Sequence, residues 1–248
     1  METIYTIPVN EAFEKVTGDG GKCTCPFCLM YNRLEDNELD LILGASMMEP
    51  DVRQQTNKLG FCDTHLGLMF ARGKKLPLAL LLESHLAHYS AYIDSGKGSL
   101  FTGMKANSAI KELSDLSSSC YVCGRIESNF SRMIDTAALL WESDEQFREK
   151  VAAAPYFCLK HYPRFVKAAR DRMEKKSFAE FYKAVSEKEA KYMTSLKEDV
   201  SWFCKKFDYR YENEPWGNAK DAPERAEKFL DGTLHVYEDE DKPSDALT

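Results

Sequence analysis

The sequence predicts a mainly α-helical protein made of two duplicated helical units, each clipped by a Cys3His zinc site, plus a long C-terminal helix. Three observations lead to this prediction. A cysteine–histidine signature occurs twice, apolar residues recur at helical spacing around both copies, and a long amphipathic stretch follows them. The only candidate for extended structure is a short piece at residues 4–9.

Each copy of the signature has a Cys-x2-Cys pair and, after thirty-three or thirty-four residues, a Cys-x2-His pair. Three thiolates and one imidazole form a closed tetrahedral set that suits zinc. We therefore expect two zinc ions per chain, each bound within one copy. The expected ligands are Cys25, Cys28, Cys62 and His65 in the first copy, and Cys120, Cys123, Cys158 and His161 in the second.

The ligand chemistry favours a structural role for the metal. Four protein ligands leave no open position for water or substrate, and three thiolates give a divalent site a net negative charge that makes it a poor Lewis acid. Iron, alone or in a cluster, is the weaker alternative, because three cysteines and one histidine can also hold it. Ordinary burial of cysteines as small apolar residues does not explain a spacing that is kept twice.

The two copies match beyond their ligands. Cys25 and Cys120 are offset by 95 residues, whereas Phe61 and Phe157, each directly before a Cys-x2-His pair, are offset by 96. One extra residue in the second copy accounts for the difference. A shared pattern of this length indicates the duplication of one structural unit.

Helical periodicity surrounds both copies. Breaks at Pro50-Asp51 and at Ser143-Asp144 mark fresh helical starts. Helices are expected within residues 29–48 and 126–141, and over 65–72, 78–93, 162–175, 178–207 and 222–230. The longest of these helices should bury one apolar stripe, made of Phe178, Tyr182, Val185, Met193, Leu196, Val200, Phe203 and Phe207.

These elements divide the chain into four parts. They are a first helical unit (1–100), a second helical unit (101–176), a long packing helix (177–207), and a C-terminal arm with an acidic tail (208–248). Residues 96–99 and 117–119 are expected to form flexible linkers, and the tail from residue 238 should be solvated. The long helix should pack across both units or pair with a second chain, which makes a homodimer one expected assembly.

Several motifs together resemble a known family. They are the Cys-x2-Cys and Phe-Cys-x2-His pairs, the Lys-Phe-Asp-Tyr-Arg stretch at 206–210 and the Glu-Pro-Trp-Gly stretch at 214–217. In this combination the chain resembles, over nearly its whole length, an uncharacterised bacterial family, a domain of unknown function common in Gram-positive anaerobes. The resemblance implies a bacterial, cytoplasmic and duplicated protein, and it implies no activity.

Composition narrows the possible classes of protein. The chain has 248 residues, of which 44% are hydrophobic, enough for a real core. The apolar run at residues 76–82 is too short to span a bilayer, and the first residues lack the basic and apolar regions of a signal peptide. We therefore expect a cytoplasmic protein with reduced thiols and no membrane partner. A net charge of −7 argues against nonspecific binding to nucleic acid.

Two functional hypotheses follow from the cysteines. The first is a zinc-stabilised binding or scaffold protein for an unknown protein or small-molecule partner, without catalytic residues. The second is a thiol-based redox sensor or thiol enzyme that uses Cys25 and Cys28, with Cys23 as a resolving or substitute thiol. Cys204, the other cysteine outside the signatures, is expected to pack in the core.

Three further features point less specifically to function. His85 and His88 share a helical face and could bind a metal, but no further ligand lies nearby in sequence. The basic stretch 160–176 is compatible with a nucleic-acid adaptor, although a solvated helix face explains it better. The aromatic and acidic stretch 208–216 could form a binding groove or could clamp the C-terminal segment onto the helical body.

Overall fold

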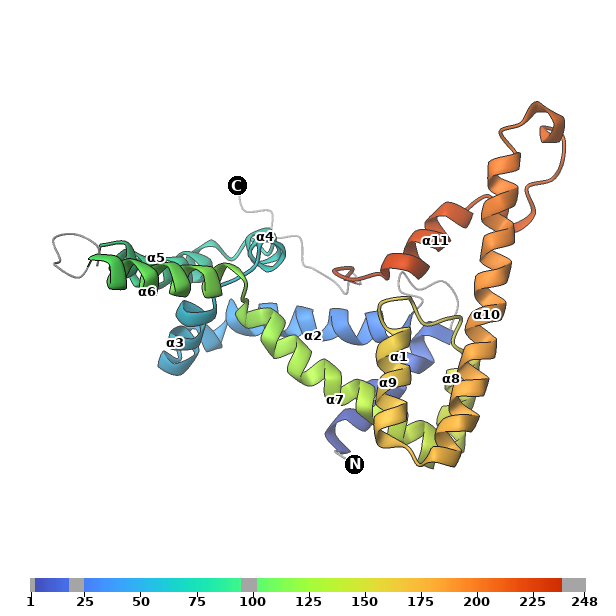
Figure 1. Ribbon diagram of the computed structural model, residues 1–248, viewed down its shortest axis with the longest axis horizontal. Helices are drawn as coiled ribbons and strands as arrows, with labels where there is room; N and C mark the ends of the chain where they lie inside the picture. Colours follow the sequence, from blue (N-terminus) through green and yellow to red (C-terminus); the bar gives the residue numbers. More distant parts are fainter. Residues whose placement is uncertain (1–2, 18–24, 95–101, 238–248) are drawn as a thin grey trace. The chain divides into compact units, whose positions relative to one another are not determined.

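The chain is mainly helical in the computed structural model, which describes residues 3–17, 25–94 and 102–237 (Figure 1). No β-strand occurs within these ranges, so the expectation of a mainly α protein is confirmed. The α-helices are α1 (Thr6–Thr17), α2 (Pro26–Ile42), α3 (Pro50–Leu59), α4 (Asp63–Ala71), α5 (Lys75–Asp94), α6 (Thr102–Ser117), α7 (Tyr121–Ser143), α8 (Glu145–Ala153), α9 (Tyr162–Arg172), α10 (Lys175–Lys205) and α11 (Ala222–Asp231). Short 3-10 turns are η1 (Thr3–Tyr5), η2 (Ala45–Met48), η3 (Tyr209–Tyr211) and η4 (Gly217–Ala219).

Three sequence signals explain where α3, α8, α9 and α11 begin or end. Proline stands in the first turn of α3, α9 and α11, where its missing N–H costs no helical hydrogen bond. The Asp144 carboxylate caps α8 by accepting hydrogen bonds from the backbone N–H groups of Gln146 and Phe147. Gly60 and Gly232 end α3 and α11 at φ values of 63° and 79°, a region that favours glycine.

The expected extended piece at residues 4–9 is wrong, because η1 and α1 occupy it. Val9, Ala12, Phe13 and Val16 are all buried on one face of α1, at spacings of three and four residues. A window that ends at Val9 misses this helical period, which becomes visible only over the following turns. The sequence analysis also did not anticipate α6. The predicted flexible linker at residues 96–99 and the acidic tail from 238 lie outside the described residues.

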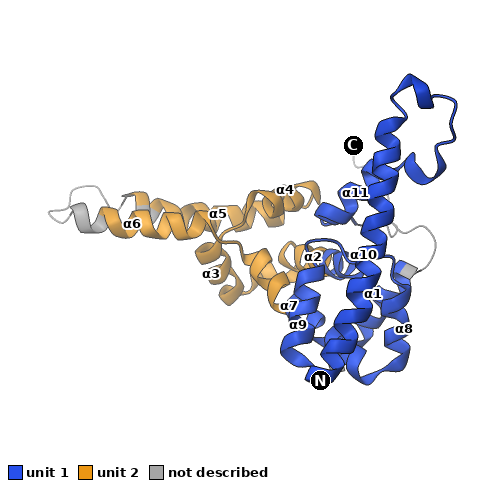
Figure 2. Cartoon of the chain, turned by 45° about the vertical axis from the view of Figure 1, so that its right-hand side comes forward, with its two compact units in different colours: residues 1–33, 130–248 blue, residues 34–129 orange. Residues whose placement is uncertain are grey.

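The chain forms two compact units, which do not follow the order of the two signature copies. Unit 1 consists of residues 1–33 and 130–248, and unit 2 of residues 34–129 (Figure 2). The unit boundaries fall inside helices α2 and α7. Helix α2 therefore carries the chain from unit 1 into unit 2, and α7 carries it back.

An aromatic cluster forms the core of unit 1. Its six phenylalanine side chains come from five helices and from the loop before α9, and all are 0% exposed: Phe13, Phe27, Phe147, Phe157, Phe165 and Phe181. Neighbouring ring centroids are 4.8–6.5 Å apart and the planes are tilted or edge-on, the geometry that aromatic quadrupoles favour. Each Phe burial contributes roughly 2 kcal/mol from removal of apolar surface from water.

Unit 2 has a smaller aliphatic core. Helices α3 and α5 pack together, and α6 contacts both of them. The fully buried aliphatic side chains come from the second half of α2 and its exit, from α4, from α5 and from the start of α7: Leu39, Ile42, Leu43, Met69, Leu81, Val122 and Ile126. Several large apolar side chains of α5 remain exposed, including Leu76 and Leu86.

Helix α10 buries only part of the predicted stripe, namely Val185 and Leu196. Phe181, Val185, Glu189 and Leu196 are its buried residues, whereas Tyr182, Met193 and Phe207 of the predicted stripe are exposed. The helix carries apolar residues around a wide arc, and contacts with α8, α9 and α11 select which part of the arc is covered. The buried face of α10 includes Glu189, so a pattern of apolar residues alone does not identify this face.

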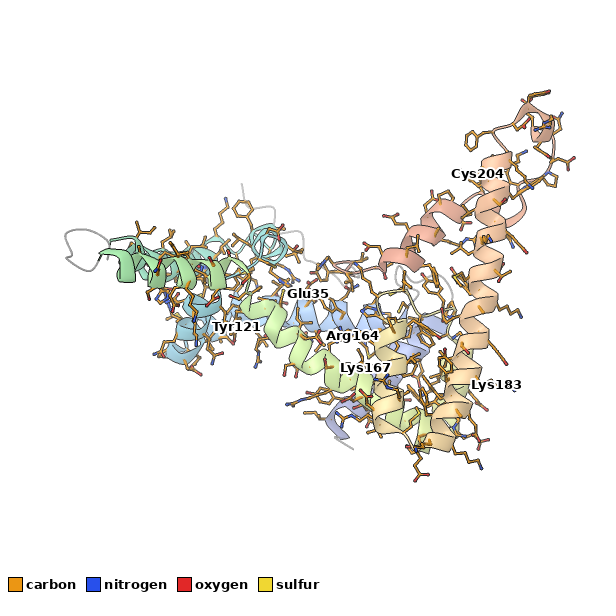
Figure 3. The ribbon with its side chains drawn as sticks, in the orientation of Figure 1. Glu35, Tyr121, Arg164, Lys167, Lys183 and Cys204 are labelled. Atoms are coloured by element: carbon orange, nitrogen blue, oxygen red, sulfur yellow. The ribbon has the colours of Figure 1, made fainter. Side chains whose placement is uncertain are left out.

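Cys204 is also exposed, so its expected core position is wrong (Figure 3). The last turn of α10 contacts the C-terminal arm through other residues. Trp202 lies 5.7 Å from Tyr211, and Phe203 lies 5.7 Å from Trp216, between ring centroids. These contacts leave the face that carries Cys204 uncovered.

Glu189 is a buried carboxyl in the middle of α10. One oxygen, Oε1, accepts a hydrogen bond of 2.8 Å from the Phe157 backbone N–H, and Oε2 has no partner. Burial raises the pKa of Glu189 from 4.5 to about 7, and neither the Phe157 N–H nor the neighbouring Lys188 charge cancels this effect. The native state therefore holds the proton more tightly than the unfolded chain, so the contribution of Glu189 to stability falls as pH rises from about 4.5 to about 7.

We expect Glu189→Gln to stabilise the protein at pH 8 and to have a smaller effect at pH 5. The amide oxygen can still accept from Phe157, and no charge is left in the core at high pH. Thermal unfolding of wild type and variant at both pH values measures the difference, and any pH dependence shared by both proteins cancels. A constant difference in melting temperature between pH 5 and pH 8 would contradict this assignment of the buried carboxyl.

Candidate metal centres

The eight predicted ligands gather into two clusters, within each of which all the ligand atoms lie within 4.8 Å of one another. The buried cluster, in unit 1, consists of Cys25, Cys28, Cys158 and His161. The partly exposed cluster, in unit 2, consists of Cys62, His65, Cys120 and Cys123. Within the described residues, these are the groups of three or more potential ligands with spacing that suits a metal ion.

The ligand pairing expected from the sequence is therefore wrong, although the ligand residues come together. Each Cys-x2-Cys pair meets the Cys-x2-His pair of the other copy. The reason lies in the rigid helix that follows each Cys-x2-Cys pair. Helices α2 and α7 each carry the chain out of the unit that holds their own cysteines, so the next Cys-x2-His pair belongs to the other unit. Counting the residues between ligands treats that segment as a loop and misses its direction.

The buried cluster has the dimensions of a tetrahedral site. His161 Nδ1 lies 3.2 Å from Cys158 Sγ, 3.4 Å from Cys28 Sγ and 3.9 Å from Cys25 Sγ. The sulfurs of Cys28 and Cys158 are 3.6 Å apart. Metal–sulfur bonds of about 2.3 Å in tetrahedral geometry place two sulfurs about 3.8 Å apart. A zinc-sized ion therefore fits these four atoms with little movement.

Local structure positions the ligands of the buried cluster. Cys25 directly precedes α2, and its carbonyl accepts a hydrogen bond from the Leu29 N–H. His161 caps α9, and its N–H donates to the Cys158 carbonyl over 2.9 Å. Both pairs thus sit at helix starts, where the chain turns tightly and unpaired backbone N–H groups favour thiolates nearby.

The segment after α11 covers the buried cluster, a feature that the sequence analysis missed. The backbone N–H of Thr233 donates to Cys28 Sγ over 3.3 Å. The Asn32 side chain holds this segment with two hydrogen bonds. Its Nδ2 donates to the Thr233 carbonyl, and its Oδ1 accepts from the His235 N–H. A glycine after a predicted helix was the only visible signal, and it indicates a helix end without naming what lies beside it.

Gly232 makes that approach possible. A Cβ atom at this position would lie 3.0 Å from Cys28 Sγ and 3.2 Å from Cys158 Sγ. The backbone also has a φ of 79°, which L side chains rarely adopt. Glycine is therefore required here both by conformation and by the closeness of the two sulfurs.

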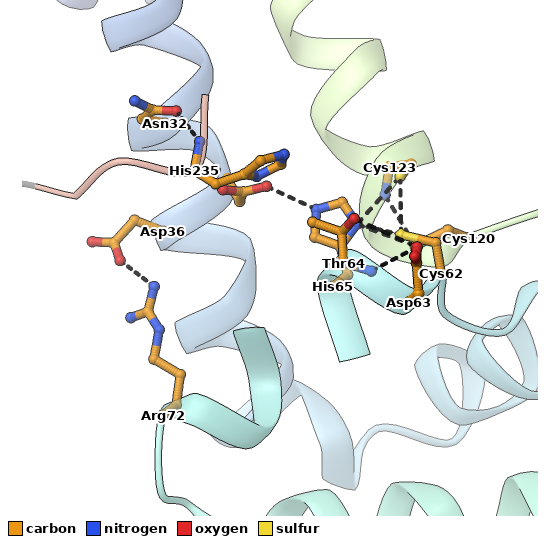
Figure 4. Close-up of polar contacts among 11 residues, drawn as sticks. Asn32, Asp36, Cys62, Asp63, Thr64, His65, Arg72, Cys120, Cys123 and His235 are labelled. Carbon is orange, nitrogen blue, oxygen red and sulfur yellow. Dashed lines mark hydrogen bonds and ion pairs between the residues drawn. The ribbon is translucent and has the colours of Figure 1, made fainter. Parts of the chain in front are cut away.

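The partly exposed cluster has similar dimensions and more access to solvent. His65 Nδ1 lies 3.2 Å from the sulfurs of both Cys62 and Cys123 and 3.4 Å from Cys120 Sγ (Figure 4). Cys62 and Cys123 are 3.9 Å apart between their sulfurs. Cys123 is exposed and Cys62 is half-buried, whereas all four residues of the buried cluster are buried.

Glu35 is the second residue that the sequence analysis missed. Its carboxylate is fully buried, and Oε1 lies 3.0 Å from His65 Nε2, the ring nitrogen that faces away from the cysteines. A carboxylate in this position fixes the histidine tautomer and ring orientation for metal binding through Nδ1. Glu35 lies on α2 within the spacer between Cys28 and Cys62, and the ligand spacing alone does not single out one acidic residue of that spacer.

In the buried cluster, the neighbouring thiols and burial raise one another's pKa values, and a bound cation would counteract this effect by stabilising the thiolates. Burial and hydrogen bonds with Cys158 and Cys28 raise the pKa of Cys25. The hydrogen bond with Cys25 lowers the pKa of Cys158, but the bond with Cys28 and burial outweigh it and raise that pKa to about 12. Several buried thiols that resist ionisation together are expected where a metal dication normally supplies the positive charge.

His65 supplies the positive charge in the other cluster. Burial acts to lower its pKa, but hydrogen bonds with Cys120 and Glu35 raise it to about 10. Burial likewise acts to raise the pKa of Cys120, but the bond with His65 lowers it to about 6. A metal ion bound at Nδ1 would take the place of the imidazolium proton, so the donor set fits a divalent cation.

The other candidate residues have structural partners. His85 Nε2 is 2.8 Å from the Tyr89 hydroxyl, and neither His85 nor His88 belongs to either of the two groups of potential metal ligands.

The basic stretch 160–176 includes α9, on which Figure 3 labels Arg164 and Lys167. Arg164 lies over the Phe130 ring, and ion pairs along the basic stretch include Lys160–Asp231, Lys167–Asp171, Arg170–Asp171 and Arg172–Asp135. This pairing reduces the free positive charge available to a nucleic acid.

The arm at residues 208–216 clamps onto the end of α10. Lys206 Nζ donates to three arm carbonyls, those of Tyr211, Glu212 and Glu214. The Trp202 indole N–H donates to the Pro215 carbonyl over 3.0 Å. These contacts correspond to the clamping alternative of the sequence analysis.

Comparison with known proteins identifies one family match. Residues 1–237 match the model described as "Family of unknown function (DUF6062)". No curated protein and no solved structure matches the chain. Within the described ranges, none of the helices combines the length and apolar character needed to cross a bilayer.

We expect Gly232→Ala to weaken metal binding at the buried cluster by roughly tenfold, because the added methyl group pushes against two ligand sulfurs and displaces the Thr233 N–H. Gly217→Ala is the matched control, since Gly217 also has a positive φ, 56°, but no atom within 4 Å of its Cβ position. Competition with a chromophoric chelator measures zinc affinity in both variants. Equal affinities would show that the covering segment does not act on the ligands.

Proposed function

This chain belongs to the family of unknown function DUF6062, and we propose from its two clusters that it is a zinc-stabilised binding or scaffold protein in which both zinc ions are structural. The observation that carries the proposal is the closed set of four protein ligands in each cluster. A complete tetrahedral set leaves no coordination position for a substrate. The clusters support a metal that holds the fold and does no chemistry.

Zinc is the metal that best suits these ligands. Thiolate and imidazole donors at tetrahedral spacing favour zinc, while harder cations such as magnesium and calcium prefer oxygen. Iron is the alternative, and elemental analysis separates the two. The reduced thiols that zinc requires also fit a bacterial cytoplasm, the compartment expected from the sequence.

A structural role is supported by what each cluster joins. The buried cluster connects the start of α2 with the start of α9, more than one hundred residues later in the chain. Metal binding at such a site becomes folding free energy, on the order of 10 kcal/mol in zinc-finger peptides. Closing a long loop in this way opposes the conformational entropy of the segments between the ligands.

The crossed ligands also bear on the predicted duplication. If one ancestral unit held a single Cys-x2-Cys pair and a single Cys-x2-His pair, two copies could have exchanged these halves as a homodimer. Fusion of the copies would then give one chain with two crossed sites. This origin accounts for the nearly equal spacing in sequence together with the exchanged ligands in space.

A thiol-based redox sensor is the second candidate, and exposure limits it to the partly exposed cluster. Cys123 is exposed and Cys62 is half-buried, so an oxidant can reach these sulfurs. Cys25 and Cys28, which the sequence analysis favoured for this role, are 1% and 0% exposed. Cys23, the suggested resolving thiol, lies outside the described residues.

The structural role predicts two zinc ions per chain in protein purified without added metal. We expect Cys28→Ser to lose one zinc and to lower the melting temperature by about 10 °C, since several kcal/mol of metal-linked folding energy disappear. Cys204→Ser is the control, because Cys204 is exposed and belongs to neither cluster. Elemental analysis and calorimetry of the three proteins measure both quantities.

Two outcomes would contradict the proposal. If Cys28→Ser keeps two zinc ions and the wild-type melting temperature, the buried cluster is not a structural site. If mild peroxide quickly releases one zinc from wild type and forms a reversible disulfide between Cys62 and Cys123, the redox candidate replaces the scaffold for that cluster. Retention of both ions under the same peroxide treatment supports the structural role.

A further inference from the structure

A large cavity lies between α8 and α10 of unit 1. Its volume is about 760 Å³, within the range typical of small-molecule sites. Both helices contact each other in the structure, and Trp141 of α7 closes one side. The residues that line it are Trp141, Arg148, Val151, Ala152, Ala153, Ala154, Pro155, Ala184, Val185, Lys188, Lys191, Tyr192 and Ser195.

The cavity wall is mainly apolar and made of small side chains. A row of three alanines and a proline ends α8 and begins the following loop, and Ala184 faces the cavity from α10. Short side chains at this crossing leave space that larger ones would fill. Trp141 and Tyr192 provide flat apolar surface at the sides, so the wall suits an apolar ligand body.

All the charged residues that line the cavity are basic. They are Arg148 from α8 and Lys188 and Lys191 from α10. Within the described part of the chain, none of the three has a carboxylate at ion-pair distance: Arg148 donates to the carbonyls of Trp141 and Glu142, and Lys188 donates to the Val151 carbonyl over 2.7 Å. The nearby carboxyl of Glu189 is directed to the Phe157 N–H and does not line the cavity.

The two lysines are held differently. Lys188 Nζ is fixed by the Val151 carbonyl and lies 4.5 Å from the centre of the Phe157 ring. Lys191 is exposed one helical turn further along α10. One cation is therefore preorganised at the wall and a second can close over a ligand, an arrangement suited to a single anionic group.

We propose that this cavity binds a free carboxylic acid with an apolar body, its carboxylate placed between Lys188 and Lys191 and its body against the alanine wall and Trp141. The charge of the lining excludes cationic ligands, and its apolar wall disfavours small polar anions such as phosphate. This proposal gives a ligand class to the binding protein proposed above and rests on that function. A smaller cavity of about 370 Å³ near the end of α10 has both acidic and basic lining residues and gives no such preference.

Isothermal titration calorimetry with octanoate tests the proposal on the full, zinc-loaded chain. We expect saturable binding of one octanoate and clearly weaker binding of 1-octanol, which has the same chain without the charge. Lys191→Glu should weaken octanoate binding by about tenfold, because it replaces an attraction by a repulsion at an exposed position of α10. Lys183→Glu is the matched control, since Lys183 is also exposed on α10 and does not line the cavity.

A second variant tests the apolar wall. Ala184→Phe should fill part of the cavity from an exposed helix position and abolish octanoate binding while α10 stays folded. Zinc content and circular dichroism are measured on every sample. Absence of octanoate binding by protein that holds two zinc ions would overturn the ligand proposal alone, and so would equal effects of Lys183→Glu and Lys191→Glu. Loss of zinc in wild type would instead count against the proposed function.

Discussion

The crossed grouping of the cysteine and histidine pairs into two clusters is the constraint on which the rest of the molecule depends. Helices α2 and α7 each begin beside a Cys-x2-Cys pair and then carry the chain into the other unit. Unit 1 therefore combines the two ends of the chain, and its cluster joins Cys25 and Cys28 to Cys158 and His161, whereas unit 2 is the continuous segment between them. Helix propensity alone would hold such a unit weakly, since its closest packing partners are separated by a long stretch of chain.

The two clusters share ligands but differ in what surrounds them. The buried cluster is covered by the segment after α11, whose backbone N–H donates to a ligand sulfur. The partly exposed cluster instead has a buried carboxylate behind its histidine and an exposed cysteine in front. Backbone donors stabilise thiolate charge, and a carboxylate strengthens the histidine as a ligand. The two sites can thus hold the same metal with different rates of exchange and of oxidation.

The sequence was sufficient to pick out the residues that gather in the two clusters and to place most helices, because spacing and periodicity are local properties. It was insufficient for the pairing, which depends on the direction in which α2 and α7 carry the chain. Glu35 and Gly232 were missed for a related reason, since each acts on ligands that are remote in sequence. The buried face of α10 was predicted only in part, because Glu189 takes a core position that an apolar pattern assigns to another residue.

Zinc counting in two double variants tests the crossed ligation most directly. Cys28→Ser with Cys158→Ser removes two ligands from the buried cluster and should leave one zinc per chain. Cys28→Ser with Cys62→Ser removes one ligand from each cluster and should leave almost none when a chelator competes. The reverse result, one zinc in the second double variant and none in the first, would contradict the crossed arrangement and restore the pairing within each copy.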